Sequence, residues 1–316
     1  MTRFIVRKLL FLLLTLCLLS ALVFVLVRII PGDVVNVLLG GEGGYFPERI
    51  EAMRKEFGLD QPLSVQFFLW AKSFLTGNFG ISLRSGKPVI NDLLIRLPVT
   101  VELMVGAVVV ALLLGIPLGV LAAIKRNTAV ESFVQMVGLL GLSIPEFWWG
   151  TLLILGAAIY APWIPTTGYV PIFSDSIANL KAMFLPILTL GVISSAVIMR
   201  MTRSAMLEVL GAEYITVSRA KGLRKRDVLF RHALRNALIP VVTVAGVQAG
   251  QMLGGAIVIE QLYALPGVGR FVLDGVLGRD YPVIQIGVLA IALAFVLINS
   301  LTDILYAVID PRVRLR

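Results

Sequence analysis

The chain alternates between long apolar runs and shorter polar segments. A helix that crosses a bilayer needs roughly 20 mostly apolar residues. Six runs come close to this length or exceed it, at residues 9–27, 103–124, 133–160, 185–199, 237–259 and 284–306. The third run is interrupted at Pro145 and Glu146, and the fourth is expected to extend at both ends. The pattern predicts an all-α polytopic membrane protein with six transmembrane helices.

The composition agrees with a membrane environment. Hydrophobic residues make up 58% of the chain and charged residues 15%, against about 45–50% and about 25% in soluble domains. The first run is longer than the apolar region of a signal peptide, and no clear A-x-A cleavage site follows, which favours a retained helix. Cys17 and His232 are the only residues of their types, so we expect no disulfide framework and no metal site.

Positive charges indicate the orientation. With the N-terminus in the cytoplasm, the inside segments hold 17 Lys and Arg residues and the short outside loops hold 3. The loop at residues 31–98 is left out, because loops this long translocate regardless of charge. Both termini are therefore expected in the cytoplasm.

The expected outside segments contain short helices. Residues 47–57 indicate an amphipathic helix that ends at Gly58, and residues 63–75 carry aromatic side chains suited to a helix at the membrane interface. Residues 264–282 indicate a small helix between Gly and Pro residues.

The cytoplasmic segment at residues 218–240 holds seven Lys and Arg residues and divides at Gly222. Residues 205–221 predict a helix. Gly222 is expected to end it in a left-handed conformation, and Leu223 is expected to make the apolar contact that often accompanies such a helix end. Downstream, apolar residues recur at helical spacing, namely Leu229, Phe230, Ala233, Leu234, Ala237 and Leu238.

Three interpretations of this segment compete. Attraction to anionic lipid would explain its positive charge but not its helices. Nucleic-acid binding is disfavoured, because no reading domain is present. A docking element for a cytoplasmic protein explains the helix–glycine–helix pattern as well.

Several motifs together resemble the permeases of binding-protein-dependent ABC importers, and within them the B-type permeases of dipeptide, oligopeptide, glutathione and nickel systems. They are RKLLFLLLTL…VRIIPGD, FGLDQPLSVQFFLW…GNFGISL, RAKGL…HALRNALIP, LPGVGRFVLDGVLGRDYPVIQ and DILYAVIDPRVR. One departure stands at Thr216, Val217 and Ser218, where the general importer loop has an acidic residue and two alanines. A specific acidic docking contact is therefore not carried over.

The resemblance implies an ABC importer permease fold, with a first transmembrane helix at residues 1–30, an extracytoplasmic loop with short helices at 31–98, and a five-helix core at 99–316. The coupling loop at 203–239 would dock on an ATPase through Glu213, Tyr214, Ser218, Arg219, Ala220, Lys221, Gly222 and Leu223. The supporting residues would be Arg224, His232, Arg235, Asn236 and Pro240.

The membrane runs contain further candidates for helix packing or for the translocation path. Gly246, Gly250 and Gly254 recur every four residues, which suits close packing either within the chain or against a second permease. Gln248 and Gln251 lie on the same run. Glu146 follows Pro145 and suits either a helix end in a wet cleft or a transport role. Glu260 and Asp303 are expected at the interfaces.

No catalytic residues are expected. The chain has no phosphate-binding G-x-x-x-x-G-K-[ST] loop and no H-E-x-x-H motif. Gly267-Val-Gly269 indicates a turn. His232 is expected to be a solvated or docking residue. ATP and Mg would be bound by partner subunits.

By resemblance, the chain is a permease subunit of an ATP-driven importer for di- or oligopeptides in the bacterial inner membrane. It would act with a second homologous permease, two ATPase subunits or domains, an extracytoplasmic solute-binding protein and membrane lipid. Glutathione or nickel import is the alternative within the family. An ion-coupled secondary transporter is the alternative from another class, but internal repeats and midplane charges are not evident.

Overall fold

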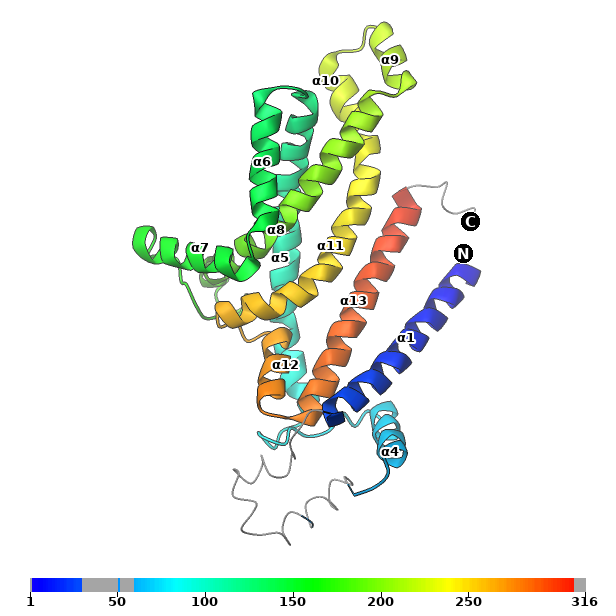
Figure 1. Ribbon diagram of the computed structural model, residues 1–316, viewed down its shortest axis with the longest axis vertical. Helices are drawn as coiled ribbons and strands as arrows, with labels where there is room; N and C mark the ends of the chain where they lie inside the picture. Colours follow the sequence, from blue (N-terminus) through cyan, green and yellow to red (C-terminus); the bar gives the residue numbers. More distant parts are fainter. Residues whose placement is uncertain (1, 30–50, 52–59, 310–316) are drawn as a thin grey trace. The chain divides into compact units, whose positions relative to one another are not determined.

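The structure is a computed structural model that describes residues 2–29, 51 and 60–309 (Figure 1). Within these ranges the backbone is mostly helical, and the β pairing is limited to an isolated bridge between Ile81 and Pro88. The all-α prediction is confirmed. The helices are α1 (Thr2–Ile29), α4 (Leu63–Leu75), α5 (Val89–Ile124), α6 (Ala129–Ser143), α7 (Glu146–Tyr160), α8 (Ser176–Leu210), α9 (Glu213–Ala220), α10 (Lys225–Asp227), η2 (Val228–Leu234), α11 (Arg235–Leu262), α12 (Val268–Leu277) and α13 (Tyr281–Ile309).

Five of these helices, or helix runs, are long and apolar enough to cross a membrane. A sixth span is obtained if α6 and α7 are counted as one, although they bend by 104° at their junction. Proline restricts the residue before it to extended conformations, and Ile144 has φ −89° and ψ 127°. The interruption predicted at Pro145 is therefore a sharp bend, and α7 starts again at Glu146.

The short helices agree with the sequence where they are described. α4 spans the predicted interface helix, and α12 lies in the segment expected to hold a small helix. The helix predicted at residues 47–57 falls outside the described residues except for Glu51, and the arginines beyond residue 309 also lie outside them.

The described residues form two compact units. Unit 1 takes residues up to 98 together with 267–294, and unit 2 takes 99–266 together with residues from 295 onward. In unit 1 the start of α5, α12 and the start of α13 share a buried apolar cluster that includes Val89, Phe271 and Ile286. Beside it, a series of aromatic rings runs from α1 through α4 to the following loop, through Phe24, Phe67, Trp70, Phe74 and Phe79.

Asp280 ties a loop of unit 1 to the start of α13. It is 4% exposed, and its carboxylate accepts hydrogen bonds from the Ser82 hydroxyl at 2.5 Å and from the backbone N–H groups of Leu83 and Arg84 at 3.3 and 3.4 Å. A carboxylate is acceptor-only, so several converging donors can share it. Asp280 thereby fixes the loop that precedes α5.

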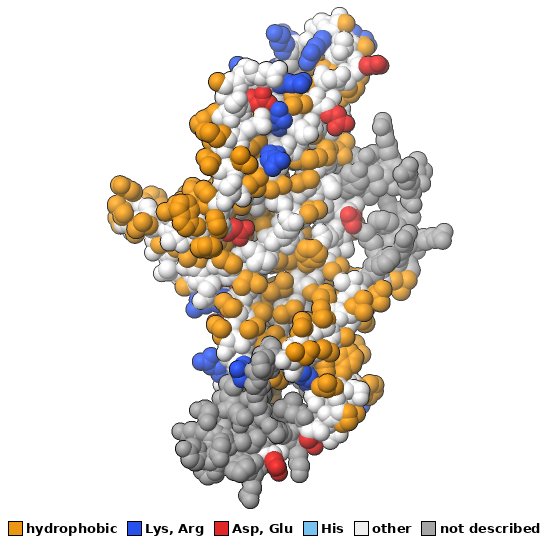
Figure 2. Space-filling model, in the orientation of Figure 1, with side chains coloured by type: hydrophobic (Ala, Val, Ile, Leu, Met, Phe, Trp, Pro, Cys, Tyr) orange, Lys and Arg blue, Asp and Glu red, His pale blue; other side chains and the backbone are white. Residues whose placement is uncertain are grey.

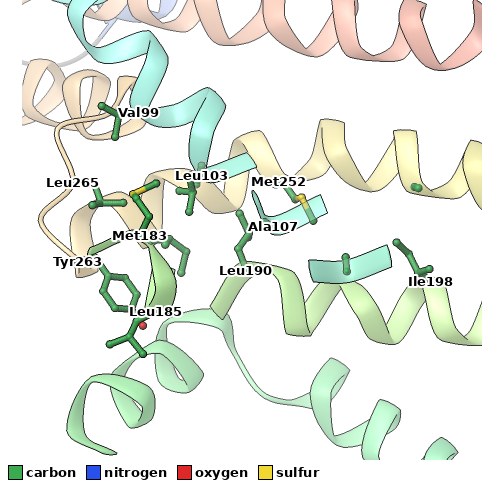
Figure 3. Close-up of a cluster of buried hydrophobic side chains, with 14 of the residues drawn as sticks. Val99, Leu103, Ala107, Met183, Leu185, Leu190, Ile198, Met252, Tyr263 and Leu265 are labelled. Atoms are coloured by element: carbon green, nitrogen blue, oxygen red, sulfur yellow. The ribbon is translucent and has the colours of Figure 1, made fainter. Parts of the chain in front are cut away.

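Unit 2 is built around α8, which packs against α5, α6, α7 and α11. Figure 3 shows its apolar core, where Leu103 and Ala107 of α5 lie near Leu190 of α8 and Met252 of α11. At Gly115 and Gly119 of α5, an added Cβ would come within 2.8 Å of the Ser195 carbonyl oxygen and 2.6 Å of the Met199 carbonyl oxygen. Glycine spaced by four lets two helix backbones approach closely, so these positions set the α5–α8 contact.

Replacement of Asp280 by asparagine tests the loop anchor. We expect Asp280→Asn to destabilise unit 1 by about 1–3 kcal/mol, because the amide nitrogen would face backbone donors. In the purified complex, trypsin should cleave faster after the exposed residue Arg84. Asp274→Asn, the same change at an exposed position, is the control. Equal cleavage rates in the two variants would contradict the anchoring role.

Candidate functional site

The predicted coupling segment projects from one end of unit 2 (Figure 1). α8 ends at Leu210, and Gly211, with φ −85°, follows as a right-handed cap. α9 begins at Glu213 as a separate helix. The prediction of one helix over residues 205–221 is therefore wrong in its continuity. The chain turns between α8 and α9, so α9 can lie across the end of the unit.

Gly222 ends α9 as predicted. Its φ is +77°, in the left-handed region, and no described heavy atom would lie within 4 Å of an added Cβ. Only the backbone conformation therefore demands glycine here. Leu223 is 42% exposed and does not belong to the buried cluster beneath α9. That cluster therefore does not contain the apolar contact predicted for Leu223.

A small buried cluster holds the projection together. Ile215 of α9 is fully buried against Val228, Ala233 and Ala237, together with residues of α5 and α8. Residues 228–234 form a π-helix, whose i→i+5 bonding places Val228 and Ala233 on one face. This explains why Phe230, expected on the apolar face from α-helical spacing, is 52% exposed.

The predicted coupling residues are accessible and some are linked. Most of them are exposed, with Ser218 half-buried, and on the face drawn in Figure 2 Lys and Arg side chains gather at this end of unit 2. The side-chain amide of Asn236 donates to the Tyr214 hydroxyl at 2.8 Å and to the His232 carbonyl at 3.0 Å. Asn236 thus joins the start of α11 to α9. Arg224 and Arg235 are exposed, and Pro240 lies inside α11.

An ion pair that the sequence interpretation missed lies at the base of the projection. Arg203 of α8 donates to the Glu131 carboxylate of α6, with its Nε atom at 2.7 Å. The same carboxylate accepts the Asn127 backbone N–H at 2.5 Å, where Asn127 has φ 62°. The turn between α5 and α6 is thereby fastened to α8. In the sequence, Arg203 counted only as a positive charge.

The glycines of α11 divide into two groups. An added Cβ at Gly246 would collide with Thr302, and one at Gly250 would lie 3.0 Å from the Phe295 ring, so both pack against α13 inside unit 2. At Gly254 no described heavy atom lies within 4 Å of that position. Gly254 shares an exposed face, at helical spacing, with Val247, Gln251 and Val258. Gln248 is half-buried.

Glu146 occupies the first position of α7, after Pro145. A carboxylate in the first turn is favoured by the helix dipole. Its Oε2 atom lies 2.7 Å from the position of an added Cβ at Gly255, so α7 approaches α11 at this point. These contacts favour a helix end packed within the unit.

Two acidic side chains, Glu260 of α11 and Glu102 of α5, accept hydrogen bonds within unit 2. Glu260 is fully buried and accepts the Thr100 hydroxyl at 2.6 Å. Its expected position at the membrane interface stays a prediction. The Tyr169 hydroxyl donates to Glu102 at 3.0 Å, and burial together with this bond raises the pKa of Tyr169 to about 12. The phenol therefore stays protonated as a donor. Asp303 is exposed.

Cation-binding groups do not gather in the part of the chain that the structure describes. No three His, Cys, Asp or Glu side chains there are placed to hold a metal ion.

The fold and the helical projection define a class: a polytopic α-helical membrane protein with the architecture of an ABC transporter permease. Among solved structures, a chain of the MetNI methionine ABC transporter in inward-facing conformations superposes with a TM-score of 0.57 at 21% identity, covering 71% of this chain and 98% of that one. The chain belongs to the family described as binding-protein-dependent transport system inner membrane component, whose model matches residues 115–315. A model for the N-terminal part of such components matches residues 1–104.

Curated relatives match over nearly the full length. The dipeptide transport system permease protein DppB of Escherichia coli K12 is 41% identical, over 99% of each chain. The di/tripeptide transport system permease protein DppB of Pseudomonas aeruginosa is 39% identical over the same shares. A putative peptide transport system permease protein of Brucella abortus is 40% identical over 93% of each chain.

Alanine substitutions separate the two groups of glycines. We expect Gly246→Ala to destabilise the chain by about 1–3 kcal/mol, because its methyl group would be forced against Thr302. Gly254→Ala is the matched control and should leave the thermal stability of the isolated chain in detergent unchanged. Equal melting temperatures for both variants would refute the assigned α11–α13 contact.

Proposed function

We propose that this chain is one of two transmembrane subunits of an ATP-driven importer for di- or oligopeptides. The full-length 41% identity with a dipeptide permease is the observation that carries the substrate class. Glutathione or nickel import remains the alternative within the family. This chain would supply the path across the membrane.

The proposed assembly has further chains. Two ATPase subunits or domains would bind ATP and Mg and dock on the exposed surface of α9 around Gly222. A second homologous permease would cover the α11 face that carries Gln251 and Gly254, which is uncovered among the described residues. A solute-binding protein would deliver the substrate on the opposite side of the membrane. The bias of 17 positive charges against 3 supports cytoplasmic termini and a cytoplasmic α9.

Coupling would pass through contacts within unit 2. Movement of the ATPases would act on α9, which is held to the start of α11 by Ile215 and by the Asn236–Tyr214 hydrogen bond. The Arg203–Glu131 pair holds α8 and α6 at the same end. A rigid connection of this kind lets ATP-driven closure favour one of two helix packings.

The substrate class is tested on the purified complex. We expect binding protein loaded with dipeptide to stimulate ATP hydrolysis severalfold over unliganded binding protein. Binding protein offered glutathione or nickel is the comparison. Stimulation by nickel or glutathione alone would overturn the peptide assignment and leave the permease role standing.

The coupling role of Gly222 is tested by a matched pair. Proline fixes φ near −65°, whereas Gly222 has φ +77° and donates its N–H to Arg219 at 3.0 Å. Gly222→Pro should therefore abolish substrate-stimulated ATPase activity, or the co-purification of the ATPase, while membrane insertion persists.

Gly222→Ala should weaken coupling less, because left-handed alanine costs about 1–2 kcal/mol. Gly211→Ala makes the same change at a right-handed glycine and should behave like wild type. Normal uptake by Gly222→Pro would refute the docking assignment.

A further inference from the structure

Unit 1 contains a pocket of about 300 Å³ between the end of α1, α4 and the start of α13. In Figure 1 these three helix ends lie together, and direct contacts join them. The walls of the pocket combine aromatic rings with a few polar groups, among them Arg28, Trp70, Phe74, Phe79, Tyr281 and Gln285.

Arg28 brings a positive charge to this pocket. It is half-buried, its Nε atom donates to the Gln66 side chain at 2.8 Å, and its guanidinium lies 3.5 Å from the centre of the Phe24 ring. One Nη atom reaches the Phe24 carbonyl at 3.4 Å. A guanidinium has five N–H donors. The partners of Arg28 within residues 2–29 and 60–309 are all neutral, so its positive charge has no counter-ion among these residues. Several of its N–H donors remain for a ligand.

Gln285 provides an independent indication of a ligand. Its side chain is 4% exposed, lines the pocket, and has an amide nitrogen with no hydrogen-bond partner in the described structure. Buried polar groups are almost always paired, so a lone donor in the wall of a cavity indicates an acceptor from outside the chain. Capping of the α1 C-terminus explains the Arg28–Phe24 bond, but it does not explain this amide.

The surroundings indicate where that acceptor comes from. α4 exposes large apolar side chains, and Leu69, which is 52% exposed, also lines the pocket. Helices with such a face lie at the membrane interface, and aromatic residues concentrate at the same depth. A ligand there would present an anionic group to Arg28 and Gln285 and an apolar part to α4.

We propose that this pocket binds the phosphate of an anionic phospholipid headgroup. The Arg28 guanidinium and the Gln285 amide donate to the phosphate oxygens, since arginine is well suited to phosphate recognition. The acyl chains lie along the exposed apolar side of α4. The bound lipid thereby fastens the end of α1 to the interface helix and to the start of α13.

Thermal unfolding of the purified, delipidated complex tests the site. Dioctanoyl-phosphatidylglycerol should raise the melting temperature in a saturable way. Inorganic phosphate at equal concentrations should bind at least about tenfold more weakly, because it lacks the apolar part. Arg28→Gln and Gln285→Leu should each weaken the apparent affinity for the lipid about tenfold or more. Arg84→Gln, at an exposed arginine of the same unit, is the matched control and should bind like wild type.

Gln285→Leu also keeps the test independent of folding. Leucine removes the unpaired buried donor, so the lipid-free complex should melt at the same or a higher temperature while losing the response to lipid. Wild-type lipid affinity in both Arg28→Gln and Gln285→Leu would overturn the site. Equal stabilisation by inorganic phosphate would overturn the proposal that the bound phosphate belongs to a lipid headgroup.

Discussion

The close approach of α5 to α8 is the contact on which unit 2 depends. A bilayer gives little hydrophobic driving force between apolar helices, so association relies on tight packing. Gly115 and Gly119 bring α5 onto the backbone carbonyls of Ser195 and Met199. This fixes α8 as the central helix, against which α6, α7 and α11 then pack.

The position of α8 determines what happens at the α9 end. Arg203 lies on the same helix a turn beyond Met199, and there it meets Glu131, which also holds the turn after α5. Gly211 then lets the chain leave α8 and form α9. The end of unit 2 that carries the basic residues of α9 and α10 is therefore continuous with the close α5–α8 contact, which suits an element that transmits force.

The lengths of the apolar helices and the glycine and proline positions that end them could be predicted from the sequence. Hydrogen bonds between polar residues far apart in the chain could not. The six apolar runs, the interface helix and the left-handed Gly222 follow from local rules on length, aromatic content and glycine. The burial of Glu260 was not predicted, because its partner Thr100 lies 160 residues away. Glu131 was missed for the same reason. Gly115 and Gly119 of α5 have the same four-residue spacing as Gly246 and Gly250 of α11. The close α5–α8 contact could therefore have been predicted from the sequence.

The π-helix between α9 and α11 has a consequence for movement at that end. A π turn holds one more residue than an α turn, so residues 228–234 store extra chain between two fixed helices. Conversion of that stretch to α geometry would release one residue, equivalent to about 1.5 Å along the axis and about 100° of rotation. A change of register in this stretch would therefore move the start of α11 by a discrete step without melting either helix.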